Sequence, residues 1–227
     1  KKVLMTGATG YIADQLLPAF KERYQMVLVD VSEDNRRGER VEGGVTADLM
    51  DPDRTLYDPP FDGVDAVVHM GYKPRSGEAI DHFFSEKANV EMCYNVLRAS
   101  YDAGVRRVVF ASSNHAADWY EHNLVHQRKM DMVEPNTYPL SDNFYGWSKI
   151  SMEAMGFIFA CGVPAVQDAS GRELLLSGEK PGRKMGVIML RIGHARELDP
   201  ANYDHDPALY KRVLGCHLSA RDLTQLV

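Results

Sequence analysis

Tyr145 and Lys149 are the residues whose types and spacing point most directly to chemistry. They lie four positions apart in the segment NFYGWSK, residues 143–149. On a helix, side chains with this spacing share one face, with their Cβ atoms about 5–6 Å apart. A free phenol has a pKa of about 10, and a nearby ammonium lowers it by favouring the phenolate. The pair therefore predicts a tyrosine that takes a proton from a substrate hydroxyl, although ordinary helices also contain this spacing.

A glycine-rich turn near the start of the chain predicts a phosphate-binding site. Residues 6–13, TGATGYIA, place Gly7 and Gly10 between an apolar run and a segment with helical spacing. Glycine lets the backbone approach a pyrophosphate, and the first helical turn, with Tyr11 and Ile12, offers free N–H groups and a positive dipole end. Ala13 stands where a small residue allows the helix to pack on the strand. A simple turn is the alternative interpretation.

Asp30 strengthens the prediction of a dinucleotide site. It ends the second apolar run, 23 residues after Gly7. At this place in a dinucleotide-binding unit, an acid accepts hydrogen bonds from the ribose hydroxyls of adenosine. The same carboxylate repels a 2′-phosphate, so the cofactor expected is NAD rather than NADP. Arg36 and Arg37 follow closely and would weaken this preference.

The elements that must position these residues alternate between apolar strands and helices. Strands are expected at 2–7, 24–30, 41–49, 65–71, 106–113 and 185–193, and helices at 11–23, 78–103 and across the Tyr145 segment. This alternation predicts an α/β fold whose parallel sheet is covered on both faces. The polar segment 118–143 is expected to form a loop over a site, and the Gly- and Pro-rich segment 162–184 an inserted loop or hairpin. A further helix is expected to start after Ser219.

Composition narrows the class of protein. The 227 residues fit one large α/β domain or two small ones. The net charge of -6 argues against a nucleic-acid partner. No apolar run is long enough to span a membrane, and the strand-like first residues leave no room for a signal peptide. The three widely separated cysteines predict reduced thiols without a zinc site. A cytoplasmic protein without a metal is therefore expected.

With TGATGYIA, Asp30, FASSNH and YGWSK in this order, the chain resembles the extended short-chain dehydrogenase/reductase family, which includes NAD-dependent epimerases and dehydratases. The resemblance runs from residue 2 to about 227 and leaves out 162–184. It implies a single NAD-binding domain over 1–227, a Rossmann-type doubly wound parallel sheet with a small C-terminal substrate-binding region. Segments 114–143 and 193–218 would contact the substrate. It also implies a homodimer built on the long helix and the Tyr145 helix.

The same resemblance assigns roles to individual residues. Ser113, Tyr145 and Lys149 match the catalytic set. The residues placed around the cofactor are Gly7, Gly10, Tyr11, Ile12, Asp30, Asp48, Leu49, Met70, Gly71, Asn89, Tyr145 and Lys149. Of these, Asp48 and Leu49 match the pair that flanks the adenine, and Asn89 matches a residue that supports the site.

A narrower resemblance connects the chain to uronate dehydrogenases and related archaeal-type sugar dehydrogenases. It rests on SSNH at 112–115, LRIG at 190–193 and the pattern S-x-x-D-L at 219–223. It implies that the substrate contacts come from Ser113, Asn114, His115 and Arg191, with Arg191 binding a sugar carboxylate. The loop GYKPRSG at 71–77 departs from the Gly-rich, Ser-containing loop of those enzymes, because Ser76 is out of register.

The function expected is oxidation of a sugar or sugar acid at its C1 hydroxyl to a lactone, with Tyr145 as the base and NAD as the hydride acceptor. A nucleotide-sugar epimerase or dehydratase and an NAD-binding regulator without catalysis are the alternatives. His115 also fits an ordinary loop histidine, and Arg191 a partner of a carboxylate within the protein. His122 and His126 have a metal-like spacing, but the glutamate of a zinc-peptidase helix is missing.

Overall fold

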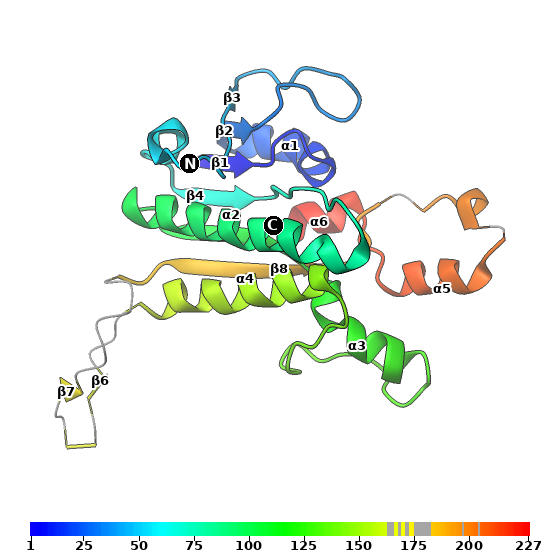
Figure 1. Cartoon of the computed structure of the whole chain (residues 1–227). Helices are drawn as coiled ribbons and strands as arrows, with labels where there is room; N and C mark the ends of the chain where they lie inside the picture. The colour runs from blue at the N-terminus through cyan, green and yellow to red at the C-terminus, as the bar shows by residue number, and fades with distance from the viewer. Residues whose placement is uncertain (163–165, 168, 171–172, 175–182, 197, 204) are drawn as a thin grey trace.

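The computed structural model describes residues 1–162, 166–167, 169–170, 173–174, 183–196, 198–203 and 205–227. The strands of its main sheet are β1 (Lys2–Thr6), β2 (Gln25–Asp30), β3 (Gly44–Thr46), β4 (Ala66–His69), β5 (Arg107–Ser113) and β8 (Gly186–Ile192). All are parallel, in the order β3-β2-β1-β4-β5-β8 (Figure 1). This is the order of a doubly wound, Rossmann-like sheet, so the predicted fold class is confirmed.

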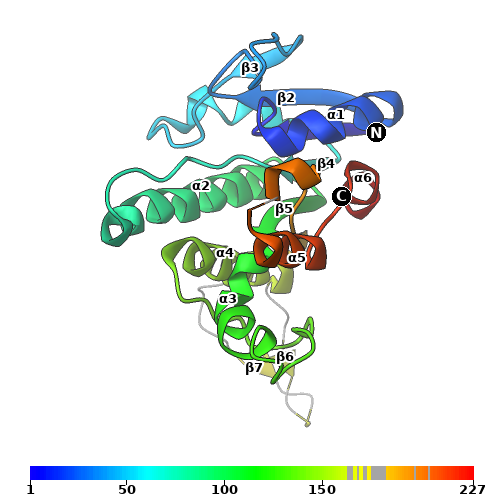
Figure 2. The ribbon, with the colours of Figure 1, turned by 90° about the vertical axis from the view of Figure 1, so that its right-hand side faces the viewer.

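Helices cover both faces of this sheet (Figure 2). One face packs against α1 (Tyr11–Arg23) and α6 (Ala220–Leu226), and the other against α2 (His82–Asp102) and α4 (Phe144–Cys161). The strands supply both cores because successive side chains point to opposite faces. In β1, Val3 and Met5 pack toward α1, whereas Leu4 packs toward α2 and α4. Strands that are buried on both faces need apolar residues at every position, which is why their sequences are continuous apolar runs.

Shorter helices gather mainly near the carboxyl edge of the sheet (Figure 1). They include α3 (Asp118–Tyr120), α5 (Pro207–Gly215) and the turns η4 (Asn114–Ala117), η5 (Glu121–Val125) and η6 (Pro200–Tyr203). The segment 118–143, expected to be a loop, therefore begins with helical turns. The turns η1 (Arg54–Leu56), η2 (Pro59–Phe61) and η3 (Ala79–Asp81) lie in other connections.

Several element boundaries differ from the expectation for local reasons. The third strand contracts to Gly44–Thr46, because Gly43, with a φ of 76°, stands in a turn. The long helix α2 starts at His82, after the 3₁₀ turn η3. Helix α1 continues through Pro18. The helix expected after Ser219 forms as α6, with the Ser219 hydroxyl accepting from the Asp222 N–H at 3.1 Å.

The segment 162–184 lies largely outside the described residues. Within it, β6 (Val166–Gln167) and β7 (Glu173–Leu174) pair in antiparallel fashion. The predicted inserted hairpin stays a prediction for the rest of the segment. Among the helices of the described residues, none is long and apolar enough to cross a membrane.

Candidate active site

The turn after β1 lies tightly against the end of β4, at the point where the strand order reverses. Gly7 has a φ of 73°, and a Cβ added there would overlap the backbone of Met70 and Gly71. Its N–H donates to the Val29 carbonyl oxygen at 2.9 Å, which ties the turn to the end of β2. Only glycine combines this φ with so close an approach. The reversal point is where open α/β sheets bind ligands.

The first turn of α1 and the end of β2 present groups that fit a dinucleotide. The N-cap Gly10 has no side chain to accept from the first N–H groups of α1, and both Tyr11 and Ile12 line a cavity. The Asp30 carboxylate accepts from the Thr9 N–H at 2.9 Å and from the Val31 N–H at 2.7 Å. These bonds hold the carboxylate at the cavity wall, where it has lone pairs left for ribose hydroxyls.

A cavity of about 760 Å³ runs along the carboxyl edge of the sheet and connects this cradle with Tyr145. Most of the predicted site residues line it: Gly7, Gly10, Tyr11, Ile12, Asp30, Met70, Gly71, Ser113, Asn114, His115, Tyr145 and Lys149. They come from seven elements or connections and meet because the carboxyl ends of parallel strands lie at one edge. The predicted catalytic residues and most of the predicted cofactor residues therefore line one cavity.

The start of α4 places Tyr145 at this cavity. The side chain of the N-cap Asn143 accepts from the Gly146 N–H at 2.9 Å. A Cβ on Gly146 would overlap Ser141 and the His115 carbonyl oxygen, so glycine is needed for α4 to approach the turn after β5. The spacing from Tyr145 to Lys149 then turns both side chains toward the same wall of the cavity.

Lys149 is a buried cation beside the Tyr145 ring. Its Nζ donates to the Ala111 carbonyl oxygen at 2.7 Å and lies 5.5 Å from the centre of the Tyr145 ring. Burial disfavours the ammonium and lowers the pKa of Lys149 to about 8. The lowered tyrosine pKa expected from the sequence is not what the structure shows: burial raises the pKa of Tyr145 above its ordinary value, and the neighbouring Ser113 side chain offsets this only in part. The three residues therefore form one interacting set.

The Tyr145 ring is enclosed by three further side chains. The Tyr72 ring packs edge-on at a centroid distance of 5.6 Å and the His115 ring at 5.4 Å. The Arg75 guanidinium lies 5.3 Å from the centre of the Tyr145 ring. Tyr145 thus has two cationic side chains within 6 Å of its ring centre, Arg75 and Lys149.

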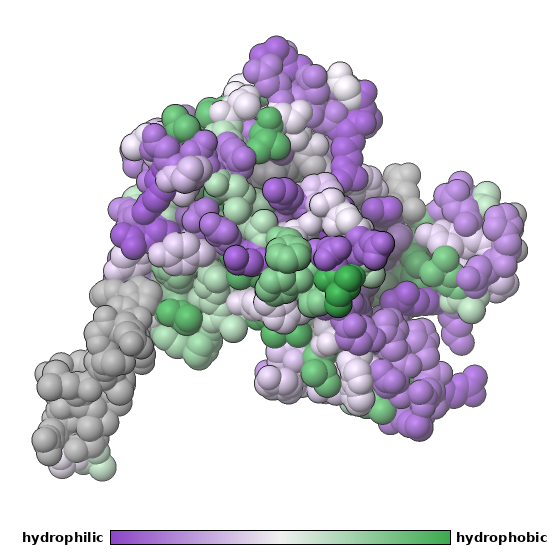
Figure 3. All heavy atoms as spheres, in the orientation of Figure 1, coloured by the Kyte–Doolittle hydropathy of each residue, from purple (hydrophilic) through white to green (hydrophobic). Residues whose placement is uncertain are grey.

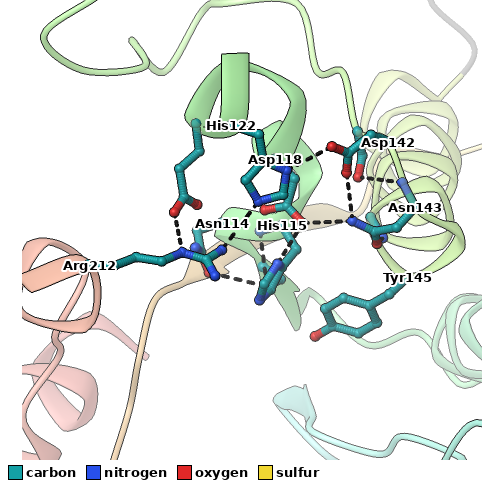
Figure 4. A network of polar contacts seen from close by, with 12 residues as sticks. Asn114, His115, Asp118, His122, Asp142, Asn143, Tyr145 and Arg212 are labelled. Atoms are coloured by element: carbon teal, nitrogen blue, oxygen red, sulfur yellow. Dashed lines mark hydrogen bonds and ion pairs between the residues drawn. The ribbon is translucent and has the colours of Figure 1, made fainter. Parts of the chain in front are cut away.

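A polar network fixes His115 to the start of α4 (Figure 4). The buried Asp118 carboxylate contacts His115 Nδ1 at 2.7 Å and accepts from the Asn143 side chain at 2.7 Å through the same oxygen. Since Asn143 caps the helix that carries Tyr145, Asp118 ties the histidine and the tyrosine to one another. His115 Nδ1 is occupied, so its Nε2 is the ring nitrogen left for a ligand.

A comparison with known protein families identifies the chain. The model of the NAD dependent epimerase/dehydratase family matches residues 3–165. The chain belongs to this family. The family relationship agrees with the glycine turn, Asp30 and the Tyr145–Lys149 pair, all of which lie inside the matched segment.

The relatives of this family member include sugar dehydrogenases. An NAD-dependent glucose-6-phosphate dehydrogenase of Haloferax volcanii is 26% identical over 99% of this chain and 78% of its own length. A uronate dehydrogenase of Pseudomonas putida is 29% identical over 65% of this chain and 51% of its own length, so the match spans about half of that relative. A mutated uronate dehydrogenase structure has a TM-score of 0.67 at 21% identity, covering 100% of this chain and 67% of that one.

Four of the predicted site residues of this family member do not line the cavity. Leu49 is buried in the core, and Asp48 accepts from the Met50 N–H at 2.8 Å. Asn89 bonds the backbone of Lys73, accepting from its N–H at 2.7 Å and donating to its carbonyl oxygen at 3.0 Å. Asn89 therefore holds the loop between β4 and α2 rather than facing the cavity.

Arg191 has a partner within the protein. Its guanidinium makes a bidentate pair with Glu153 of α4, at 2.9 Å and 2.7 Å. The Ser112 hydroxyl donates to the same carboxylate at 2.6 Å. Arg191 lines a second cavity, of about 1220 Å³, rather than the one that contains Tyr145. The alternative interpretation, a pair with a carboxylate of the protein itself, is thus favoured over a role in binding the substrate carboxylate.

Sequence reasoning did not single out Arg75, Asp118 or Arg212. Arg75 lies in the loop noted only as a departure from the uronate dehydrogenases. Arg212 lies on α5, which carried no recognised signal, and lines both cavities while pairing with Glu121. Their roles depend on contacts between segments far apart in the chain, which no local pattern reveals.

The metal-like histidine spacing does not lead to an evident metal site. Ligand atoms of Asp118, Glu121 and His122 lie within 4.8 Å of one another. The Arg212 guanidinium pairs with Glu121 and approaches His122 Nε2 at 3.5 Å (Figure 4). A positive group thus already neutralises this cluster, and His126 contacts Glu121 at 3.1 Å rather than joining it.

Proposed function

We propose that this protein is an NAD-dependent dehydrogenase that oxidises a sugar or sugar acid at the C1 hydroxyl to a lactone. One observation carries the proposal: Tyr145, whose ring centre lies 5.5 Å from the Lys149 ammonium, lines the same cavity as Ser113 and the Gly7 and Asp30 cradle. A proton acceptor and a dinucleotide cradle in one cavity are what such an oxidation needs. The sugar dehydrogenases among the relatives support the substrate class.

Each residue of the site has a separate role in the proposed reaction. Ser113 binds the C1 hydroxyl and holds its proton toward Tyr145, and Tyr145 takes that proton as general base. Lys149 favours the phenolate through its charge, and Asn114 and His115 bind ring hydroxyls. When bound, NAD supplies the acceptor for the hydride that leaves C1. The segments 114–143 and 193–218 contribute to the substrate end, since Asn114, Leu209 and Arg212 line the cavity.

The direct test is NADH formation across a panel of hexuronic acids, aldoses and phosphorylated sugars. The proposal expects turnover with at least one of them, dependent on NAD. Asp30 favours NAD over NADP, although the exposed Arg36 also lines the cavity. An Asp30→Ala variant is therefore expected to reduce the ratio of kcat/KM with NAD to kcat/KM with NADP. Lack of turnover with every sugar of the panel would contradict the proposal.

The rate of the reaction is expected to fall above about pH 8. Lys149 has its pKa lowered to about 8, so at higher pH it loses the charge that stabilises the phenolate. Unfolding does not explain such a fall. The pKa of Lys149 is lower in the folded than in the unfolded chain, so this residue makes folding more favourable as the pH rises from 8 toward its ordinary value.

Profiles of kcat/KM against pH for the wild type and Lys149→Arg test this expectation. Arginine keeps its charge at high pH, so the variant is expected to be slower but to lose the decline above pH 8. An unchanged decline in Lys149→Arg would assign the descending limb to another group.

A nucleotide-sugar epimerase is the second candidate, and the adjoining cavity favours it. This cavity of about 1220 Å³ shares Asn114, Arg212 and Cys216 with the Tyr145 cavity. A sugar at Tyr145 could then extend into it with a larger substituent. Epimerisation of a uridine diphosphate sugar without net formation of NADH would favour this candidate, and NADH release would favour the dehydrogenase.

We also propose a homodimer formed through the exposed face of α2 and α4. This face carries large exposed apolar and aromatic side chains, and Figure 3 shows green patches over this part of the molecule. They are Phe83, Phe84, Tyr94, Trp147 and Ile158. Contiguous apolar surface of this kind marks interaction sites.

Charged substitutions on this face test the dimer. Phe84→Glu and Ile158→Glu, at positions 68% and 49% exposed, are expected to convert the dimer to a monomer, because each would bury a charge at the interface. Light scattering after gel filtration measures the change. Leu56→Glu, at an exposed apolar position on η1, is the control and should remain dimeric. A monomeric wild type at micromolar concentration would refute the proposed interface.

A further inference from the structure

We propose that Arg75 is an anion-binding residue of the substrate site and selects sugars that carry a carboxylate or a phosphate. The inference rests on the proposed function, since it takes the C1 hydroxyl of the sugar to lie at Tyr145 and Ser113. It also assigns to Arg75 the role that the sequence suggested for Arg191, whose guanidinium is occupied by Glu153.

The loop that carries Arg75 is held in place on both sides. Upstream, Asn89 bonds the Lys73 backbone through an N–H and a carbonyl oxygen. Downstream, the Ser76 N–H donates to the Ser85 hydroxyl at 3.3 Å. The Tyr72 hydroxyl donates to the fully buried Glu86 carboxylate at 2.7 Å. These contacts with α2 pre-position the loop, which lowers the cost of ordering its side chains around a ligand.

Arg75 itself has donors to spare. Its side chain is 45% exposed and lines the cavity 5.3 Å from the centre of the Tyr145 ring. Its Nε lies 3.8 Å from Glu86, beyond hydrogen-bonding distance. Each Glu86 oxygen already accepts a shorter hydrogen bond, from the Tyr72 and Ser148 hydroxyls at 2.7 Å each. Among the described residues, Arg75 donates no hydrogen bond.

The other cations that line this cavity are engaged elsewhere or lie at its cofactor end. Lys149 donates to the Ala111 carbonyl oxygen and is buried. Arg212 is paired with Glu121. Arg196 lies over the ring of Tyr11, at the first turn of α1, and Arg36 follows β2 near Asp30. Arg75 is therefore the cation next to Tyr145 with an unoccupied planar fork.

That fork matches an anionic substituent on the same sugar. A guanidinium binds a carboxylate or a phosphate through two parallel N–H···O bonds. With the C1 hydroxyl at Tyr145, a guanidinium 5.3 Å from the tyrosine ring lies within the width of one sugar. The geometry fits a carboxylate and a phosphate equally well. The substrate panel shows which of the two the substrate carries.

Arg75→Gln tests the proposal, with Lys73→Gln as a matched control. Lys73 is an exposed cation of the same loop whose side chain does not line the cavity. With glucuronate or glucose 6-phosphate, Arg75→Gln is expected to raise KM about 10- to 100-fold, as expected for loss of hydrogen bonds to a charged group. With glucose it should leave KM nearly unchanged. An equal loss with glucose would overturn the proposal, because Arg75 would then act on Tyr145 rather than on the substrate.

Calorimetry separates this inference from the proposed function. Glucuronate and glucose 6-phosphate are titrated into the protein loaded with NADH, where oxidation cannot proceed. Binding of one of them by the wild type and by Lys73→Gln, with loss in Arg75→Gln, supports the anion site even if no sugar is oxidised. Binding unchanged by Arg75→Gln, or no binding of either anion, overturns it, even if a neutral sugar is a substrate. The anion that binds identifies the substituent.

Discussion

Tyr145→Phe is expected to keep NAD binding and to lower turnover by a factor of about 100 to 10,000, the range that general acid–base groups contribute. The substitution removes only the phenolic oxygen, which as phenolate would accept the proton. The ring contacts with Tyr72 and His115 remain available to phenylalanine, so the wall of the cavity should keep its shape. NADH formation measures turnover, and quenching of protein fluorescence by NADH measures binding.

Tyr72→Phe is the control for this variant. It also removes a tyrosine hydroxyl near the site, but that hydroxyl donates its hydrogen bond to the buried Glu86 carboxylate rather than to a substrate. It should reduce stability, because a buried carboxylate loses a donor, and it should retain most of the turnover. Unchanged turnover in Tyr145→Phe would remove the proposed base, and loss of NADH binding would show that the ring itself is needed for the cofactor.

Gly7→Ala is expected to cost about 2–5 kcal/mol of folding free energy and to abolish NAD binding. The positive φ of Gly7 accounts for about 1–2 kcal/mol with a Cβ present. The overlap of that Cβ with the backbone of Met70 and Gly71 adds about 1–3 kcal/mol. Such a loss is a large part of the stability of an ordinary domain. The end of β4 would have to shift, and it forms one wall of the cofactor cradle.

Gly38→Ala isolates the effect of close packing. Gly38 has a φ of 76°, almost that of Gly7, but an added Cβ would meet nothing within 4 Å. This variant should lose only the about 1–2 kcal/mol of backbone strain and bind NADH normally. Urea denaturation, monitored by circular dichroism, measures the free energy of unfolding of both variants. Equal losses of folding free energy in the two variants would mean that the close packing of Gly7 against the end of β4 does not affect stability.

The pairing of Arg191 shows where sequence reasoning stopped. The pattern LRIG placed this arginine near the end of a strand, where a substrate could reach it. Alternation along β8 decides which way it points: Ile192 faces α1 and α6, so Arg191 faces α4 and meets Glu153. Glu153, 38 positions away, became its partner only through the packing of α4 on the sheet. No local pattern identifies such a partner.

The features read correctly from the sequence depend on neighbours in the chain. The turn at Gly7, the acid ending β2 and the shared face of Tyr145 and Lys149 follow from backbone geometry and from short repeats of apolar residues. The parallel sheet follows from the alternation of those elements. Contacts across the fold decided the rest: Arg75 over the Tyr145 ring, Asp118 between His115 and Asn143, and Asn89 on the Lys73 backbone. These depend on how helices and loops pack around the sheet edge, where small changes in position exchange one polar partner for another.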